Sequence, residues 1–296
     1  MIYLKKIRKA VIPAAGLGIR FLPATKSQPK EMLPIVDKPA IQYTIEELIK
    51  SGITDIIIVT GRNKRAVEDH FDYSVELETI LEQKGKFDEL KMIREISEYA
   101  NIYYIRQKEP LGLGHAILKT KEHIGNEPFA VVLGDDIIAS EEPVIKQMID
   151  VREKNGGGSI IGVQSIEREK VSSYGIIKPR EKLSDKVCSI SDFVEKPSIE
   201  KAPSNLACLG RYILEPEIFE YLSDTKPGKD GEIQLTDGIL AMINNNKKVL
   251  AYNFDGIRYD IGDKFGYIQA NIDYALKNES LRGELTAYIK KISTIL

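Results

Sequence analysis

Two short apolar runs with a helical segment between them constrain the fold more than any other feature of this chain. The first run is residues 10–12 (AVI), at the end of a predicted strand at 7–12, and the second is in residues 55–60 (DIIIVT). Between them, residues 41–51 (IQYTIEELIKS) carry a helical pattern that starts near Pro39 and ends before Gly52. A strand, a helix and a strand in such a short stretch are typical of a parallel sheet with right-handed crossover connections.

The same alternation continues along the chain and predicts an α/β protein. In the first half we expect strands at 102–106 and 129–133 and a helix at 114–122, and the charged segment 73–97 is predicted to form two inserted amphipathic helices. The second half is richer in strands, predicted at 159–163, 174–178, 188–194, 206–213 and 249–254, with helices at 143–154, 216–222, 236–244 and 265–277. A last helix, 281–292, has an apolar stripe, so we expect it to pack on the body of the protein or on a second subunit.

Charge and composition exclude several classes of protein. The 296 residues carry a formal net charge of −2, so nucleic-acid binding is disfavoured and any phosphate site must be local. No segment approaches the roughly 18 apolar residues of a membrane-spanning helix, and the opening residues lack the apolar core of a signal peptide. Neither the cysteines nor the histidines have the spacing of a zinc site. We therefore expect a cytoplasmic protein that binds neither membranes nor zinc.

The turn after the first predicted strand is rich in glycine and is followed by two cations. Gly16 and Gly18 let backbone N–H groups approach an anion closely, and Arg20 and Lys30 supply the positive charge that a triphosphate needs. The third glycine of a dinucleotide-binding fingerprint is replaced by Phe21, and the chain contains no GxxxxGKS or GxxxxGKT phosphate loop. Taken alone, such a turn is more often a tight connection between a strand and a helix than a phosphate site.

Longer motifs favour the phosphate site. They begin with PAAGLGIRFLPATK (13–26) and PKEMLPIVDKPAIQY (29–43). They continue in order with RQ (106–107), GLGH (112–115), GDD (134–136), YG (174–175), FVEKP (193–197), PSNL (203–206), GRY (210–212), GEIQLTD (231–237) and YDIG (259–262). Together these motifs resemble the nucleotide-sugar pyrophosphorylases, in particular the bacterial UTP–glucose-1-phosphate uridylyltransferases.

The resemblance covers nearly the whole chain and implies a fold. That fold is a Rossmann-like α/β/α three-layer nucleotidyltransferase domain, similar to glycosyltransferase A, with a mixed central sheet. The whole chain, 1–296, would then be a single domain. Its nucleotide-binding half would be 1–140 with the helical insert 73–97, its sugar-phosphate-binding half 141–263, and its C-terminal helices 264–296.

The resemblance also implies a reaction. A phosphate oxygen of glucose 1-phosphate would attack the α-phosphorus of UTP in line, giving UDP-glucose and pyrophosphate, with Mg²⁺ as cofactor. This chemistry suits the sequence, because a phosphate monoester has a second pKa of about 6 and needs no general base near neutral pH. What the reaction needs is charge neutralisation and alignment of the two substrates.

Family similarity assigns the site residues by position. A carboxylate that follows a parallel strand, as Asp135 does, lies where α/β sheets bind their ligands, and carboxylates are ligands that Mg²⁺ prefers. The implied catalytic residues are Arg20, Lys30, Asp135 and Lys196, and the implied metal ligands are Asp135 and Asp260. The implied nucleotide-binding residues are Ala14, Ala15, Gly16, Gly18, Gln107 and Gly112. The implied sugar-phosphate-binding residues are Tyr174, Gly175, Glu195, Lys196, Asn205 and Gly210.

One departure and two alternatives accompany this interpretation. Ile19 stands where the family usually has threonine, so a hydroxyl that could bind a phosphate oxygen is missing.

A glucose-1-phosphate thymidylyltransferase shares the glycine loop, the acidic strand end and the EKP motif, but the insert 73–97 and EIQLTD favour the uridylyltransferase. The alternative of another class is a catalytically weak regulatory protein that binds nucleotide sugars. Members of the family are usually homodimers or homotetramers, and we expect one of these assemblies.

Overall fold

The computed structural model describes residues 4–228 and 231–295. Its strands are β1 (Lys9–Ala14), β2 (Pro34–Ile35), β3 (Lys38–Pro39), β4 (Asp55–Thr60), β5 (Asn101–Arg106), β6 (Phe129–Val132), β7 (Asp136–Ala139), β8 (Ser159–Ser165), β9 (Gly175–Lys182), β10 (Val187–Glu195), β11 (Leu206–Leu214), β12 (Val249–Asn253) and β13 (Ile257–Asp260). Its α-helices are α1 (Ala40–Lys50), α2 (Arg65–Phe71), α3 (Val75–Gln83), α4 (Phe87–Ser97), α5 (Leu113–Leu118), α6 (Lys121–Ile124), α7 (Val144–Lys154), α8 (Ile218–Asp224), α9 (Leu235–Asn244), α10 (Lys264–Lys277) and α11 (Glu279–Ser293). Short 3₁₀ turns lie at η1 (Ile19–Phe21), η2 (Ala24–Lys26), η3 (Lys30–Met32) and η4 (Arg168–Ser173).

The centre of the protein is a nine-stranded sheet in the order β5-β4-β1-β6-β11-β8-β12-β10-β9. Strands β5, β4, β1 and β6 run parallel to one another, with Ala10 of β1 opposite Ile56 of β4 and Ala130 of β6. Beyond β6 the sheet is mixed, because β11 is antiparallel to both β6 and β8 while β12 is parallel to β8. The predicted mixed central sheet is therefore confirmed.

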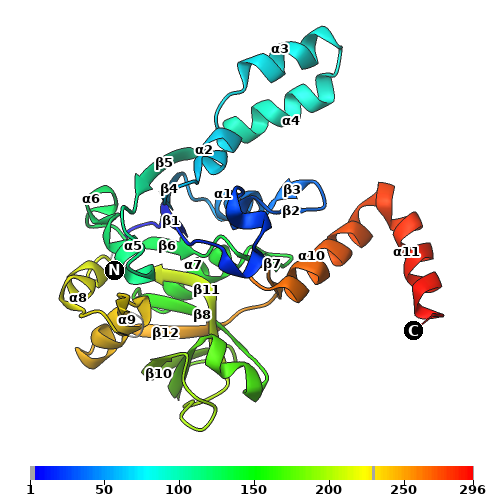
Figure 1. Ribbon diagram of the computed structural model, residues 1–296. Helices are drawn as coiled ribbons and strands as arrows, with labels where there is room; N and C mark the ends of the chain where they lie inside the picture. Colours follow the sequence, from blue (N-terminus) through cyan, green and yellow to red (C-terminus); the bar gives the residue numbers. More distant parts are fainter. Residues whose placement is uncertain (1–3, 229–230, 296) are drawn as a thin grey trace.

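Helices cover both faces of the sheet, as Figure 1 shows. Successive side chains of β1 point to opposite faces, so Ile12 packs into the core with Ile45 of α1, whereas Val11 packs into the other core with Ile117 of α5. Helices α1, α2 and α7 contribute to the first core, and α5, α8 and α9 contribute to the second. The predicted α/β/α three-layer fold is thus confirmed.

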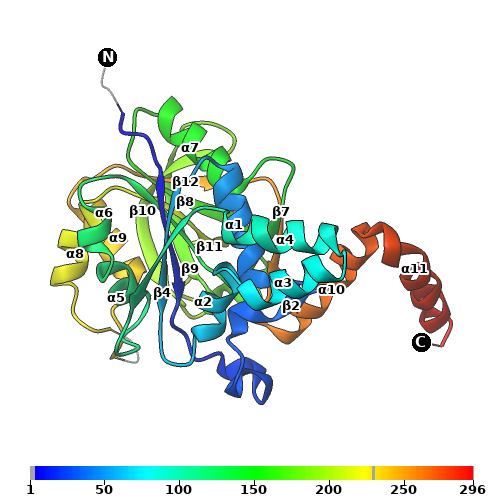
Figure 2. The ribbon, with the colours of Figure 1, turned by 90° about the horizontal axis from the view of Figure 1, so that it is seen from above.

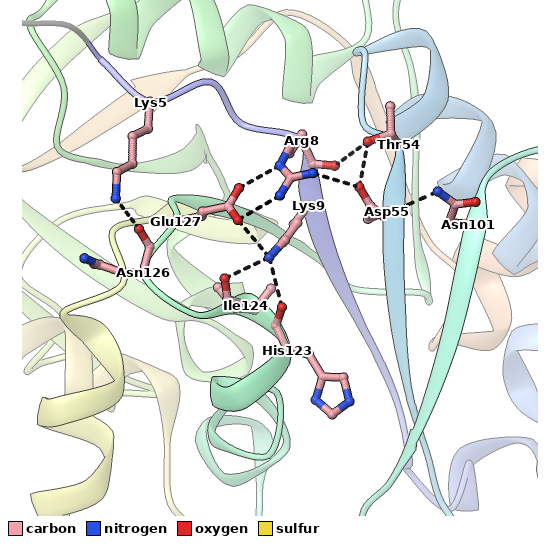
Figure 3. A network of polar contacts seen from close by, with 10 residues as sticks. All are labelled: Lys5, Arg8, Lys9, Thr54, Asp55, Asn101, His123, Ile124, Asn126 and Glu127. Carbon is pink, nitrogen blue, oxygen red and sulfur yellow. Dashed lines mark hydrogen bonds and ion pairs between the residues drawn. The ribbon is translucent and has the colours of Figure 1, made fainter.

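Polar contacts tie together the amino-terminal ends of the parallel strands (Figure 3). Arg8, directly before β1, donates two hydrogen bonds to Glu127, at 2.7 and 2.9 Å, and its own carbonyl accepts from the Thr54 N–H before β4. Lys9 Nζ lies 2.9 Å from the same carboxylate. The hydrogen bond from Arg8 is the largest influence on Glu127 and helps to lower the pKa of this carboxyl to about 2. These ion pairs and hydrogen bonds fix the amino-terminal end of the sheet, and the carboxyl end remains available for ligands.

Several predicted elements differ from the structure. The helix expected at 114–122 is two helices, α5 and α6, separated at Thr120, whose hydroxyl donates to the Ile117 carbonyl at 2.7 Å. Helix α2 was not expected. The two-stranded sheet of β7 and β13 was also missed, because its strands are short and more than a hundred residues apart, and only the tertiary structure pairs them.

Two helical segments project from the body. Helices α3 and α4 form the pair expected at 73–97, and Figure 1 shows them extending away from the sheet. Helix α11 follows α10 and turns away from the sheet in both views (Figures 1 and 2), and none of its described side chains is buried. The structure therefore does not support packing of the last helix on the body, and its packing on a second subunit stays a prediction. None of the described helices is long and apolar enough to cross a membrane.

Candidate active site

The carboxyl ends of the parallel strands open into a cavity of about 300 Å³. The loops that follow β1, β5 and β6 supply most of its lining, as expected for an α/β sheet. The predicted site residues that line it are Ala15, Gly16, Lys30, Gln107, Gly112 and Asp135. The fold thus brings together residues separated by more than a hundred positions in the sequence.

The glycine loop bends closely around Lys30. A Cβ atom on Gly16 would lie 3.7 Å from Lys30 Cε, and Gly18 has a φ of 68°, which favours glycine. The Thr25 hydroxyl donates to the Gly18 carbonyl at 2.6 Å and holds the turn. Ala14 is buried inside β1, so its side chain belongs to the core and only its backbone is available near the cavity.

Lys30 and Asp135 form an ion pair within this cavity. Burial is the largest influence on Asp135 and opposes its ionisation, but the Lys30 ammonium, a backbone hydrogen bond and Arg258 together lower the pKa of Asp135. Burial also opposes the charge of Lys30, yet Asp135 raises the pKa of this ammonium. Beneath the pair, the fully buried Glu31 accepts a hydrogen bond from Lys64 at 2.7 Å. A second, buried ion pair therefore anchors the segment that carries Lys30.

Gln107 is buried, and its side chain is held from two sides. Its Nε2 lies 3.2 Å from the Gly112 carbonyl oxygen and 2.8 Å from His115 Nδ1. The GEIQLTD segment supports this loop: the Ile233 N–H donates to the Leu111 carbonyl, and the Ile233 carbonyl accepts from the Gly114 N–H, both at 2.8 Å. At Gly112, a Cβ atom would lie only 2.7 Å from Glu232 Cβ, so a larger residue does not fit there.

A second cavity, of about 880 Å³, contains predicted residues of a different group. Arg20, Tyr174 and Asp260 line it, together with Arg258, which was not predicted. Arg258 donates to Asp136 Oδ1 at 2.6 Å and to the Tyr174 hydroxyl at 3.0 Å, and it lies 3.2 Å from Asp260 Oδ2. Within the described residues, Arg20 forms no ion pair, and its side chain is exposed.

The two predicted metal ligands meet beside Gly262, between the two cavities. A Cβ atom on Gly262 would lie 3.0 Å from Asp135 Oδ2 and 3.1 Å from Asp260 Oδ1, so a side chain there would press against both carboxylates. Among residues 4–228 and 231–295, no group of three or more side chains could hold a metal ion. Two hard carboxylate oxygens fit a divalent cation that takes its remaining ligands from phosphate oxygens and water.

The EKP motif ends β10 and lies opposite β9. The register places Glu195 opposite Gly175, where a Cβ atom would lie 2.8 Å from the Phe193 ring and 3.2 Å from Glu195 Oε2. The Thr236 hydroxyl donates to Glu195 Oε2 at 2.6 Å. Lys196 has a φ of 44°, a strained conformation for this residue, and its Nζ lies 3.5 Å from Glu195 Oε1. The motif is thus held by contacts from two neighbouring elements.

Gly210 and Asn205 line neither of the two cavities. Gly210 is buried in β11, and a Cβ atom on it would lie 2.4 Å from Asp136 Oδ2. Asn205 is exposed, and its amide donates to the Ile166 carbonyl at 3.4 Å. Within the described residues, no hydrogen bond or ion pair joins Asn205 to the other predicted site residues. Gly18, Gly175, Glu195 and Lys196 line neither cavity either, so the roles predicted for all of these positions stay predictions.

Sequence reasoning missed several side chains that hold the site residues. Thr236 and His115 lie inside the matched GEIQLTD and GLGH motifs, so the motifs themselves carried a signal for them. Glu31 lies inside the matched PKEMLP motif for the same reason. Arg258 directly precedes the matched YDIG motif, and Lys64 lies in no matched motif. Only the tertiary contacts reveal these two partners.

Known proteins resemble the whole chain. Residues 9–277 match the family described as nucleotidyl transferase. A UTP–glucose-1-phosphate uridylyltransferase 2 of Staphylococcus saprophyticus is 55% identical over 98% of this chain and 99% of its own. A UTP–glucose-1-phosphate uridylyltransferase of Staphylococcus epidermidis is also 55% identical over the same shares.

Solved structures agree with these relatives. A UDP-glucose pyrophosphorylase complexed with UDP-glucose has a TM-score of 0.84 and 50% identity, over 92% of this chain and 100% of its own. A UTP-bound enzyme of the same kind from Acinetobacter baumannii has a TM-score of 0.88 and 40% identity, over 96% of this chain and 99% of its own. The chain belongs to the nucleotidyl transferase family and, within it, to the UTP–glucose-1-phosphate uridylyltransferases.

Proposed function

We propose that this enzyme transfers the uridylyl group of UTP to glucose 1-phosphate, producing UDP-glucose and pyrophosphate. The observation that carries the proposal is the Lys30–Asp135 ion pair, which lies in one cavity with the glycine loop and Gln107. The ion pair lies between a glycine turn that could bind phosphates and a side-chain amide that could bind a base. This arrangement suits a nucleoside triphosphate with a bound divalent cation. Relatives that bind UTP and UDP-glucose support the same substrates.

UTP would occupy the smaller cavity. Its triphosphate would lie along the backbone of Ala14, Ala15, Gly16 and Gly18, with Arg20 and Lys30 neutralising the phosphates. Its uracil would bind between Gln107 and the backbone of Gly112, because an amide and a peptide group together offer the donors and acceptors that a pyrimidine edge needs. Arg20 lines the larger cavity, is exposed and has no ion-pair partner among the described residues, so it would be available to phosphates that extend beyond the smaller cavity.

Glucose 1-phosphate would occupy the larger cavity and the adjoining end of β10. Glu195 would accept hydrogen bonds from sugar hydroxyls, and Lys196 would contact the phosphate as a point charge. Tyr174 and Gly175 would line the same site, with Asn205 and Gly210 at its margin. The hydrogen bond from Thr236 leaves Glu195 able to accept further hydrogen bonds, because a carboxylate has about four acceptor positions.

A divalent cation fits between the substrates, and we propose Mg²⁺ with Asp135 and Asp260 as its protein ligands. When bound, it would neutralise phosphate charge and help to hold the reacting groups in line. Lys30 contributes a further positive charge, and its present partner Asp135 keeps the ammonium inside the cavity. The bond between the α-phosphorus and the bridging oxygen breaks as the sugar phosphate oxygen bonds to that phosphorus, and pyrophosphate leaves.

Three broader expectations accompany the function. The chain would form one domain, divided as the sequence suggests into residues 1–140, 141–263 and 264–296. It would assemble as a homodimer or a homotetramer through surfaces that include α11, which has no buried side chain among those described. It would act in the cytoplasm.

Pyrophosphate release across a matrix of nucleoside triphosphates and sugar 1-phosphates tests the proposal. The largest kcat/KM is expected for UTP with glucose 1-phosphate in the presence of Mg²⁺, and excess chelator should reduce release to background because charge neutralisation is lost. Preference for dTTP would favour a thymidylyltransferase. Tight UDP-glucose binding without turnover would favour a regulatory protein. Undiminished activity in excess chelator would contradict the metal proposal.

A further inference from the structure

Gln107 contacts a histidine that the proposed reaction does not use. His115, in α5, is only 9% exposed and Gln107, after β5, only 6%. Their side chains meet at 2.8 Å between Gln107 Nε2 and His115 Nδ1. When two buried groups that can each donate or accept form a hydrogen bond, one must be the donor and the other the acceptor. The surrounding groups decide which is which.

The Gly112 carbonyl fixes the orientation of the Gln107 amide. A carbonyl oxygen can only accept, and this one lies 3.2 Å from the Gln107 amide while also accepting from the Ala116 N–H at 3.1 Å. The amide atom near it must therefore be the nitrogen. The same nitrogen faces His115 Nδ1, so Nδ1 accepts a hydrogen bond and the imidazole carries its proton on Nε2.

The amide oxygen of Gln107 is consequently left for a ligand. Gln107 lines the smaller cavity, and within residues 4–228 and 231–295 its Oε1 accepts no hydrogen bond. A ligand that binds in this cavity should therefore offer a hydrogen-bond donor to the Gln107 oxygen. Uracil and thymine present an N3–H donor, whereas N3 of cytosine is an acceptor.

We propose that His115 is a positioning residue for base selection: it holds the Gln107 amide nitrogen, so that Oε1 accepts from N3–H of a uracil and repels N3 of a cytosine. This inference rests on the proposed function, because it deepens the role of Gln107 in the UTP site. It assigns His115 no contact with the substrate. The histidine acts through the amide that it orients.

The arrangement requires a neutral imidazole. Burial is the main influence that lowers the pKa of His115, Lys119 lowers it further, and Glu109 raises it. Glu232 and Asp237 are the charged groups on the neighbouring GEIQLTD segment. Protonation of Nδ1 would place two donors face to face. Rotation of the amide would relieve that conflict only by placing Oε1 against the Gly112 carbonyl. Acid should therefore weaken UTP binding through His115.

The test compares the wild-type enzyme with His115→Ala and His115→Asn, using UTP and CTP as alternative substrates with glucose 1-phosphate. His115→Ala removes the acceptor, so the ratio of kcat/KM for UTP to that for CTP should fall about fivefold, mainly through KM for UTP. His115→Asn should restore most of the ratio, because an asparagine oxygen can occupy a position near that of Nδ1. An unchanged ratio in His115→Ala, or no difference between the two variants, would overturn the inference.

The pH dependence gives a second readout that a merely structural role would not change. As the pH is lowered below the ordinary histidine pKa of about 6.5, KM for UTP should rise more for the wild type than for His115→Asn. The comparison is made between enzymes at each pH, because the terminal phosphate of UTP also titrates near pH 6. Equal profiles would overturn the inference even if His115→Ala failed to fold. A wild type without UTP turnover would instead contradict the proposed function.

Discussion

Asp135 and Asp136 are adjacent in the sequence but lie in very different surroundings. Asp135 borders the smaller cavity, its side chain is 26% exposed, and its ion-pair partner is Lys30. Asp136 is 7% exposed and lies against Arg258, while Arg211 donates to its backbone carbonyl at 2.8 Å. Burial raises the pKa of the Asp136 carboxyl to about 6 in spite of the Arg258 guanidinium beside it.

The difference separates a group that can exchange partners from one that cannot. Lys30 and Asp135 both face space that a substrate could fill, so each could trade its present partner for a phosphate or a cation. Arg258 instead pairs with Asp136, whose side chain is only 7% exposed, so movement of that carboxylate would leave a buried charge without a partner. We infer that the first aspartate serves the chemistry and the second serves the framework.

Replacement of Asp135 should have the largest effect on activity. Asp135→Asn keeps the shape of the side chain but removes the charge that would face the cation, so kcat should fall by about 10²–10³-fold. The unfolding transition should change little, because the side chain is partly exposed. Steady-state kinetics and chemical denaturation measure both effects.

A matched control for this variant is Asp185→Asn, which removes a carboxylate that is 96% exposed. Its activity and stability should equal those of the wild type. Retained activity in Asp135→Asn would mean that the reaction does not need this carboxylate. A large loss of stability in the same variant would place Asp135 in the framework beside Asp136.

Removal of Arg258 should act first on stability. Arg258→Gln leaves Asp136 and Asp260 without their shared cation, and we expect the free energy of unfolding to fall by about 3 kcal/mol near neutral pH. The pKa of Asp136 should rise further, so its protonation in acid should favour the folded state. The deficit should therefore be smaller at about pH 5.5 than at about pH 8.

Guanidinium chloride unfolding at both pH values measures this change, and Arg8→Gln is the control. Arg8 also pairs with a carboxylate, Glu127, but its side chain is 52% exposed, so its replacement should reduce stability much less (Figure 3). Equal losses of unfolding free energy for the two arginine variants would mean that the buried Arg258–Asp136 pair stabilises the protein no more than an ordinary surface pair.

The smallest expected effect concerns Ile19, at the start of η1. Its side chain is 67% exposed, so Ile19→Thr should not disturb packing. The new hydroxyl could bind a phosphate oxygen, and an ordinary hydrogen bond contributes about 1 kcal/mol, so kcat/KM for UTP should rise by up to roughly fivefold. Ile19→Val, which adds no hydroxyl, is the control. An unchanged or lower kcat/KM in Ile19→Thr would contradict the prediction.

Much of the fold could be predicted because its signals are local. The apolar runs that became β1, β4 and β6 are buried on both faces, and such runs are visible without a partner strand. Strands β7 and β13 gave no comparable signal, because each has only four residues and depends on the other for its hydrogen bonds. Helix α2 was missed as well, because it is short and follows β4 closely.

For the candidate site too, some features could be predicted from the sequence and others could not. Ordered motifs pointed to Lys30, Asp135 and Gln107 because these positions lie in runs that the family shares. The motifs could not say which partner each side chain has, since a contact such as that between Lys30 and Asp135 joins positions 105 residues apart. They also could not show which predicted residues line a cavity, as Lys30 and Gln107 do, and which do not, such as Gly210 and Glu195.

The sequence by itself determined the fold class and family, because apolar strands, helical periodicity and the order of motifs can all be recognised from the succession of residues along the chain. Only the tertiary structure showed which partners the two adjacent aspartates have and how far each is buried. Asp135 ends up beside Lys30, whereas β7 begins at Asp136 and its pairing with β13 brings that carboxylate to Arg258. These partners depend on long-range strand pairing and on burial, and the residues next to the two aspartates in the sequence determine neither.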